Sequence, residues 1–212
     1  MKAVPQRSAL DFFPGKITFH SLKDAAADCK GCELYKVGTQ TVFGEGKVPS
    51  ELMFVGEVPG DYEDLEGRPF VGPAGKLFDK ALEEANIDRK QTYVTNVVKH
   101  FKWKPSPRGG KRRLHEKPNA AEIRACSPWL GAELKLVHPR ILVCLGATAA
   151  QSLLGKDFRV TKMRGQWIES EHAERTIATI HPSAILRAPD PDMRETQYRE
   201  FVSDLLTIAR EL

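Results

Sequence analysis

Residues 141–154, ILVCLGATAAQSLL, contain the pattern that decides the fold. Five consecutive apolar residues at 141–145 indicate a strand that is buried on both faces, as the strands of a parallel sheet are. Gly146 ends this run, and a helix is expected from there through ATAAQSLL. The stretch therefore predicts one strand–helix unit of a parallel sheet.

The same alternation continues in both directions along the chain. Further buried strands are predicted at residues 52–55, 92–98 and 176–180. Helices are predicted at residues 74–87, 119–137 and 192–211, and a short helix and turn at 20–36. Asn119 and Glu122 form a capping-box-like start for one of them. Residues 41–46 and the acidic segment 61–69 are expected to be loops. Alternating strands and helices predict a parallel sheet covered on both faces.

Composition limits the possible classes of protein. A chain of 212 residues, 41% hydrophobic and 28% charged, fits a soluble globular protein of one α/β domain, or at most two small ones. We take residues 1–212 as a single domain. No apolar run approaches the ~20 residues of a membrane helix, and the N-terminus lacks the apolar core of a secretory signal. We therefore expect a cytoplasmic location, no membrane partner and a monomer.

A basic segment lies between two of the predicted elements, at about 101–118. The net charge of +4 is mild, but the cations are concentrated here, with Phe101 and Trp103 among them and Glu116 as the one acid. The cationic residues from position 99 to 117 are Lys99, Lys102, Lys104, Arg108, Lys111, Arg112, Arg113 and Lys117. Such a cluster suits the neutralisation of nucleic-acid phosphates, and a solvated surface is the alternative.

Polar residues follow three of the predicted strands. Glu57, Asn96 and His181 all stand at strand ends. Ligands of open parallel sheets bind beyond the carboxyl ends of the strands, so the three are predicted to converge on a site. A carboxylate there could act as a base or an electrostatic stabiliser. The alternatives are a surface turn acid for Glu57 and structural roles for the other two.

Four cysteines raise the question of a metal. Cys29 and Cys32 form a Cys-x-x-Cys pair, which in a cytosolic chain favours metal or redox chemistry over a disulfide. Zinc is the commoner occupant and an iron–sulfur cluster the rarer one. Cys144 lies inside an apolar strand and is most simply a buried hydrophobe. Cys126 then gives a third thiolate, and the fourth ligand stays open, with His100 either a ligand or an ordinary histidine.

Several motifs together resemble one known family. They are GEVPGDYEDLEGRPFVGPAGKLFDKAL at 56–82, TNVVKHFKW at 95–103, the segment 125–155 and HPSAILRAP at 181–189. In this order they resemble the iron–sulfur (family 4) uracil-DNA glycosylases over nearly the whole chain. The sequence KRRLH at 111–115 resembles the KRRIH insertion of the UdgX branch, whose members excise uracil and stay covalently attached to the DNA.

The resemblance implies a three-layer αβα sandwich with a central four-stranded parallel sheet. It also implies a [4Fe–4S] cluster and uracil-containing DNA, single- or double-stranded, as the partner. In most of the family a cysteine occupies the position of His100, and the likeness to the UdgX branch favours a histidine ligand there. The implied ligands are Cys29, Cys32, His100 and Cys126, with Cys144 as the competitor for the fourth place.

The resemblance also implies roles for residues of the site. Phe70 matches the aromatic that stacks on the flipped uracil, and Asn96 the residue that reads its polar edge. His181 matches the histidine that stabilises the leaving base, and Glu57 would stabilise the sugar cation and orient the nucleophile. The further substrate-binding residues are Val58, Gly60, Asp61 and Arg187. Val58 departs from the glutamine usual in the UdgX branch, so a side-chain amide contact is absent there.

The predicted nucleophile is His115. A neutral imidazole nitrogen can attack carbon without prior deprotonation, so His115 is expected to bond to the sugar C1′ after uracil leaves. Lys111, Arg112 and Arg113 would anchor the loop or the phosphates. Two alternatives stay open: a turnover glycosylase in which water attacks, and a non-catalytic, metal-stapled nucleic-acid-binding module.

Overall fold

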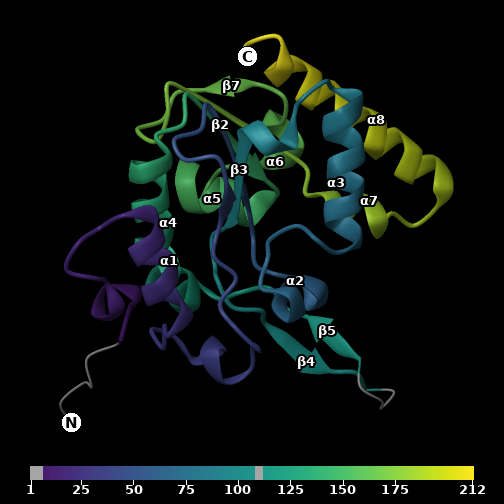
Figure 1. Ribbon diagram of the computed structural model, residues 1–212. Coiled ribbons are helices and arrows are strands. Elements are labelled where there is room, and N and C mark those ends of the chain that lie inside the picture. Colours follow the sequence, from purple (N-terminus) through teal and green to yellow (C-terminus); the bar gives the residue numbers. More distant parts are fainter. Residues whose placement is uncertain (1–6, 108–111) are drawn as a thin grey trace.

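The computed structural model describes residues 7–107 and 112–212, and a single mixed sheet lies at its centre (Figure 1). The strand order is β1-β3-β2-β6-β8-β7. The strands are β1 (Glu45–Gly46), β2 (Leu52–Gly56), β3 (Thr92–Asn96), β6 (Ile141–Leu145), β7 (Trp167–Ile168) and β8 (Arg175–Thr179). The inner four are parallel and match the four predicted strands, whereas the short edge strands β1 and β7 are antiparallel and were not predicted.

Helices cover both faces of this sheet (Figure 1). The α-helices are α1 (Phe19–Ala27), α2 (Asp61–Glu66), α3 (Pro73–Glu84), α4 (Ala120–Val137), α5 (Ala147–Leu154), α6 (Val160–Met163), α7 (Pro182–Leu186) and α8 (Pro191–Ala209). Short 3₁₀ helices occur at Ala9–Phe12, Glu33–Lys36 and Arg89–Gln91. The predicted capping box of α4 is present, with Asn119 and Glu122 bonded reciprocally. None of the described helices is long and apolar enough to cross a membrane.

Strand periodicity divides the core between the two faces. In β2, Met53 and Val55 point to a cluster that includes residues of α1, α4 and α5, and Phe54 points to a cluster with residues of α3 and α8. All five residues of β2 and of β6 are buried, as their unbroken apolar runs predicted. The three-layer architecture is therefore confirmed, with a sheet wider than expected.

Three segments expected to be loops contain regular structure, and the first is 41–46, whose last two residues form β1. Residues 61–66 of the acidic segment form α2, whose first turn carries Asp61, Glu63 and Asp64. Acidic side chains at a helix N-terminus are favoured by the helix dipole, which explains how so short a helix tolerates them. The basic segment contains an antiparallel hairpin of β4 (Trp103–Pro105) and β5 (Arg113–His115), which projects from the body of the molecule beside α2 (Figure 1).

Candidate active site

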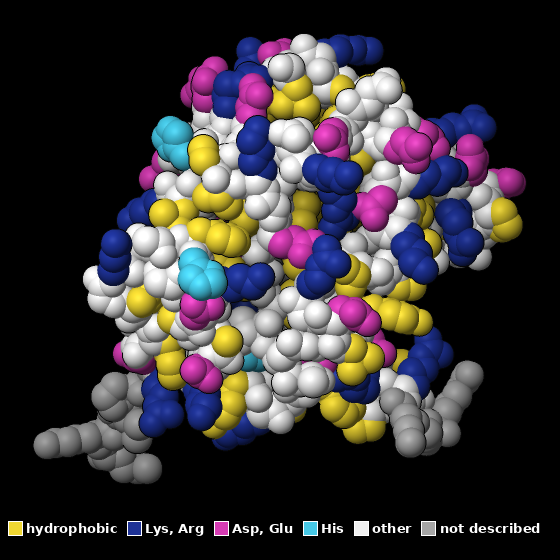
Figure 2. Space-filling model, in the orientation of Figure 1, with side chains coloured by type: hydrophobic (Ala, Val, Ile, Leu, Met, Phe, Trp, Pro, Cys, Tyr) yellow, Lys and Arg dark blue, Asp and Glu magenta, His cyan; other side chains and the backbone are white. Residues whose placement is uncertain are grey.

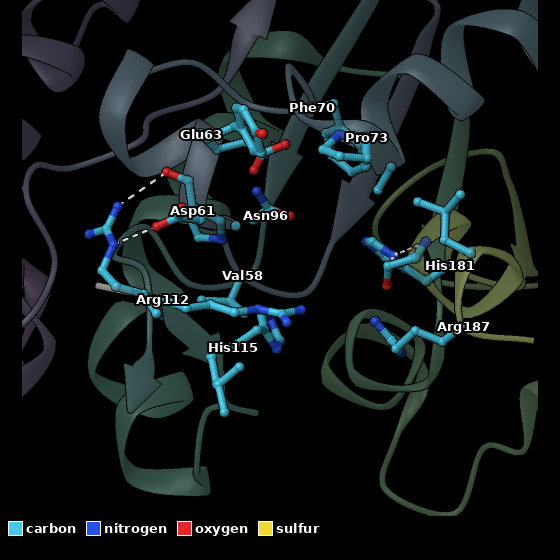
Figure 3. Close-up of a pocket in the computed structure, with 18 residues that line it drawn as sticks. Val58, Asp61, Glu63, Phe70, Pro73, Asn96, Arg112, His115, His181 and Arg187 are labelled. Carbon is cyan, nitrogen blue, oxygen red and sulfur yellow. Dashed lines mark hydrogen bonds and ion pairs between the residues drawn. The ribbon is translucent and has the colours of Figure 1, made fainter. Parts of the chain in front are cut away.

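A cavity of about 380 Å³ lies at the carboxyl ends of the parallel strands. Val58 follows β2, Asn96 ends β3 and His181 follows β8, and all three line the cavity. Figure 3 shows Asn96 deep in the site, His181 with Arg187 on one side and His115 with Arg112 on the other. The predicted convergence of strand ends is thus present, and its size is that of a small-molecule pocket.

Asn96 and Phe70 occupy space that a glycine leaves for them. A Cβ atom at Gly56 would come within 2.3 Å of Asn96 Oδ1 and 2.8 Å of the Phe70 ring. Asn96 is only 3% exposed. The absence of a side chain at the last residue of β2 therefore lets an amide and an aromatic ring meet at the base of the cavity.

Phe70 is held in an unusual backbone conformation. Its φ of 56° lies in the left-handed region, which is costly for a bulky residue. Its carbonyl packs against α3 so closely that a Cβ atom at Gly75 would lie 1.8 Å from the oxygen. The ring lies 5.3 Å from Phe78 and 5.9 Å from the His181 ring, centroid to centroid. The structure thus fixes a flat aromatic face as one wall of the cavity.

A buried lysine holds the backbone next to Asn96. Lys99 Nζ donates to the Asn96 carbonyl at 2.7 Å and to Thr95 Oγ1 at 2.6 Å, and it forms a salt bridge with Glu133 of α4. Lys99 and Glu133 are both 0% exposed. Lys99 was grouped with the surface cations of the basic segment, and that grouping is wrong because its partner comes from a helix 34 residues later.

Glu133 is fully engaged by its surroundings. Its Oε1 accepts from the Gly44 N–H at 3.0 Å, from Tyr93 at 2.9 Å and from Thr95 at 2.9 Å, while its Oε2 faces Lys99. A buried carboxylate and ammonium need this degree of hydrogen bonding to offset their desolvation. We refer to Lys99, Glu133, Tyr93 and Thr95 as the Lys99 network; it ties β3 to α4 directly beneath Asn96.

His181 has a defined tautomer. Its Nδ1 accepts a hydrogen bond from the Ser183 backbone N–H at 3.1 Å, so in the neutral ring the proton is on Nε2. Burial lowers the pKa of His181 to about 4, with smaller contributions in the same direction from Arg187 and His115. At neutral pH His181 is therefore an uncharged hydrogen-bond donor on the cavity wall.

Glu57 lies in an adjoining cavity of about 270 Å³, which shares Val58, His115, His181 and Arg187 with the first. The Thr148 hydroxyl donates to Glu57 Oε2. The other carboxylate oxygen, Oε1, lies 4.0 Å from His115 Nε2. The carboxylate therefore stands between a buried hydroxyl and the histidine of the hairpin.

His115 reaches both cavities from the end of β5. Its side chain is 43% exposed. Partial burial lowers the pKa of His115, Glu57 opposes this shift, and Arg187 adds to it. The ring is thus neutral at pH 7. Its centroid lies 6.1 Å from the centroid of the Phe101 ring.

The hairpin is attached to the body chiefly through Arg113. The guanidinium bonds to Asp61 and Asp64 of α2 and lies 5.1 Å above the Phe101 ring and 5.7 Å from the Trp103 ring. Asp64 is 0% exposed and also accepts from the Thr39 N–H at 2.8 Å. Of the predicted roles for Arg113, the anchoring of the loop is the one that these contacts support.

Several described cations of the basic segment, Arg113 among them, have acidic partners. Lys102 pairs with Glu122 and Lys104 with Glu116. Arg112 and Arg187 line the main cavity, and neither forms an ion pair with any residue at 7–107 or 112–212. Lys111, predicted to contact DNA, lies outside the described residues. Figure 2 shows Lys and Arg side chains spread among Asp and Glu over one face rather than gathered in a single patch.

The remaining predicted substrate residues lie at the first turn of α2. Gly60 is the N-cap, Asp61 begins the helix, and both line the cavity. Glu63, Asp64 and Thr148 were not predicted; Glu63 is 8% exposed and its Oε1 accepts from the Gly72 N–H at 2.9 Å. Asp61 and Asp64 share a face of α2 because they lie three residues apart, but the segment was expected to be a loop.

The predicted cluster ligands lie between α1, α4 and the end of β3. Trp129 Nε1 donates to Cys29 Sγ at 3.3 Å, and the Lys99 N–H donates to Cys126 Sγ at 3.3 Å. Burial raises the pKa of the Cys126 thiol to about 12; Lys99 opposes this shift, while Cys32 and Cys29 add to it. Two of these thiols thus have N–H donors and all three interact electrostatically in one region, whereas burial alone raises the pKa of Cys144 to about 12.

Three thiols and an imidazole are donors of the kinds that zinc and iron–sulfur clusters take. Within the described residues, no three His, Cys, Asp or Glu side chains form a group that could hold a metal ion. His100 is 5% exposed with Nε2 at 3.0 Å from Thr41 Oγ1, and metal-binding histidines commonly engage their second nitrogen in this way.

Comparison with known proteins identifies relatives over most of the chain. The family model described as "Uracil DNA glycosylase superfamily" matches residues 43–206. The "Type-4 uracil-DNA glycosylase" of Thermotoga maritima is 38% identical over 167 residues, which cover 78% of this chain and 82% of that protein. The protein of the same name from Sulfurisphaera tokodaii is 36% identical over 192 residues, covering 87% and 82%.

A solved structure supports the fold. The crystal structure of wild-type Pedobacter heparinus SMUG2 superposes with a TM-score of 0.54 at 14% sequence identity, and the match covers 76% of each chain. At this identity the likeness extends to the arrangement of the elements and no further.

Proposed function

The chain belongs to the uracil DNA glycosylase superfamily, and on that premise we propose that it excises uracil from DNA and then bonds to the abasic sugar through His115. The observation that carries the second part is the approach of His115 Nε2 to within 4.0 Å of Glu57 Oε1. His115 lines the main cavity with Asn96, Phe70 and His181. Glu57 lines the adjoining cavity, which His115 and His181 also line.

Uracil recognition is assigned to Asn96 and Phe70. The asparagine amide offers one donor and one acceptor to the polar edge of the base, and the phenyl ring offers a face for stacking. The base must leave the duplex stack, or come from a single strand, to enter so deep a site. Glycine at position 56 keeps the floor open, since a side chain there would collide with both residues.

Bond cleavage is assigned to His181 and Glu57. As the N-glycosidic bond breaks, its electron pair goes to uracil and positive charge develops on the sugar. The Nε2–H of neutral His181 can donate to the uracil carbonyl that gains charge. The carboxylate of Glu57 can stabilise the sugar cation, and uracil takes its proton from solvent.

The proposed last step is attack by His115. A ring nitrogen of the neutral imidazole donates its lone pair to C1′, and the resulting imidazolium loses the proton of its other nitrogen to solvent. The lowered pKa of His115 keeps the ring neutral and competent at pH 7. The second candidate is ordinary turnover, in which water attacks; the 43% exposure of the His115 side chain favours it, because water can reach the same place.

Denaturing electrophoresis with uracil-containing DNA tests the proposal. The expected product migrates as a protein–DNA adduct that resists heat and detergent, at one DNA per protein molecule. His115→Ala is expected to form no adduct and still release uracil. His20→Ala, which removes an exposed histidine of α1, is the control and should behave as the wild type. Multiple turnovers without an adduct would support the second candidate, and release of no base would refute both in favour of a non-catalytic binding module.

We further propose a [4Fe–4S] cluster held by Cys29, Cys32, His100 and Cys126. When bound, the cluster would cross-link the N-terminal segment to the end of β3 and to α4; no redox step is assigned to it. The protein should contain about four irons and four sulfides per chain. Cys126→Ala should lose them and Cys144→Ala should retain them. Zinc in anaerobically prepared protein, or the reverse pattern in the two variants, would contradict this assignment.

A further inference from the structure

Thr148 makes a contact that the proposed reaction does not yet use. It is the second residue of α5, directly after β6, and is 4% exposed. Its hydroxyl donates to Glu57 Oε2. β2 and β6 are neighbouring parallel strands, with Val55 opposite Cys144, so the residues that follow them come together at the sheet edge.

The hydroxyl has no competing use within its own helix. A helical threonine usually bonds to the carbonyl four residues earlier, but for Thr148 that residue, Cys144, belongs to the preceding strand. The carbonyl of Thr148 separately accepts from Ser152 Oγ at 2.7 Å, which holds the first turn of α5. The bond to Glu57 is therefore independent of the bonds that maintain the helix.

This contact determines which carboxylate oxygen is available. A glutamate has three side-chain torsions, and a partly exposed one loses rotamer entropy when it is fixed. The Glu57 side chain is 23% exposed. The Thr148 side chain is buried, so packing around it limits the movement of its hydroxyl. With Oε2 engaged, Oε1 is the oxygen that faces His115 at 4.0 Å.

We propose that Thr148 is a positioning residue for the glycosylase reaction: its hydroxyl holds one oxygen of Glu57 so that the other faces His115 and the reacting sugar. This inference rests on the proposed function. Thr148 belongs to α5 and does not line the main cavity, but it sets the orientation of the Glu57 carboxylate. A hydrogen bond to a charged acceptor is stronger than one between neutral groups, which suits it to this purpose.

Thr148→Val tests the proposal, since valine keeps the shape and removes the hydroxyl. Single-turnover uracil release and adduct formation should both slow by about tenfold or more, while the dissociation constant for uracil-DNA stays within about twofold. Thr148→Ser restores the hydroxyl and should recover most of the rate. Thr207→Val is the matched control, because the Thr207 hydroxyl donates within its own helix, to the Ser203 carbonyl.

A double-variant comparison separates positioning from folding. In a Glu57→Gln background, Thr148→Val should cost little more, because the group that it positions has already lost its charge. A Thr148→Val protein with wild-type rates overturns the proposal, as does a loss of rate that serine fails to restore. If the valine variant does not fold, Thr148→Ala removes the same hydroxyl and is judged by the same criteria. A wild type that releases no uracil refutes the proposed function instead.

Discussion

The cavity wall that carries Asn96 is part of the protein core, whereas the wall that carries His115 is a hairpin on its surface. Asn96 is 3% exposed and is supported from beneath by the Lys99 network. The His115 side chain is 43% exposed, and the hairpin is attached chiefly through one arginine. The proposed recognition step therefore depends on a buried structure, and the proposed covalent step on a half-exposed one.

This difference suggests how the two steps are separated. A base-reading amide must be held rigidly, because small displacements of a polar partner lose the discrimination that it provides. His115 stands at the end of a surface hairpin and is not part of the core. The wall that carries Asn96 therefore does not depend on it. Variants of the Lys99 network should therefore affect the whole protein, and variants of the hairpin should affect the adduct alone.

The largest effect is expected from Glu133→Gln. The amide keeps the size of the side chain but leaves the Lys99 ammonium buried without a charged partner. Breaking a buried pair in this way costs about 3–5 kcal/mol of unfolding free energy. Urea denaturation measures it. Glu195→Gln breaks an exposed helix pair with Arg199 and should cost under about 1 kcal/mol. Equal losses of unfolding free energy in the two variants would show that the buried wall with Asn96 is no more sensitive to a broken ion pair than the exposed surface.

Asn96→Ala should have the next largest effect. The polar edge of uracil then lacks its partners, which costs about 1–3 kcal/mol of transition-state binding. The measurement is the apparent second-order rate constant for uracil release in single turnovers, together with the adduct rate. Both should fall by the same factor, since both pass through the same bound base. Excision of thymine at the rate of uracil by the wild type would contradict the assignment of Asn96 as the base reader.

Arg113→Lys should have a smaller and more selective effect. Lysine cannot bridge Asp61 and Asp64 or stack on Phe101 as a planar guanidinium does. Adduct formation should slow by roughly three- to tenfold, and uracil release should change by less than about twofold. Arg199→Lys on α8 serves as the control. A parallel loss of both activities would show that the hairpin also supports the base-reading wall.

The elements that the sequence predicted correctly are those with a local pattern. The apolar runs at 52–55 and 141–145 and the capping box of Asn119 each carry their own signal within a few residues. β1 and β7 have two residues each and lack such a signal. α2 has six residues without an apolar stripe, so neither periodicity nor length marked it as a helix.

The parts of the site that were missed depend on partners distant in sequence. Lys99 resembles its neighbours Lys102 and Lys104, and only the position of α4 buries it against Glu133. In the same way Arg113 is drawn to α2, 49 residues before it at Asp64. Thr148 gains its role from the adjacency of β2 and β6, which no local pattern encodes. Asn96 and His181 were found because strand ends alone predict their location.

The smallest expected effect is a difference in pH dependence between the two histidines. Burial lowers the pKa of His181 to about 4, while the pKa of His115 is lowered less and is opposed by Glu57 and Glu63. Both rings are neutral at pH 7. As the pH falls below 6.5, His115 takes up a proton first, and a protonated ring has no lone pair with which to attack C1′. His181 remains a neutral donor over the same interval.

The adduct formed per uracil released should therefore be constant above about pH 7 and decrease as the pH falls below 6.5 toward the pKa of His181, about 4. Uracil release should persist across this interval, because water can replace the protonated histidine as nucleophile. Quantifying free uracil and crosslinked DNA in the same samples gives the ratio directly, and circular dichroism at each pH verifies the fold. A ratio that stays level or rises down to the pH at which uracil release itself is lost would mean that the hairpin supplies no neutral imidazole to the reaction. The wall that carries Asn96 and the hairpin that carries His115 would then differ only in stability, and the hairpin would not supply the nucleophile that the position of His115 implies.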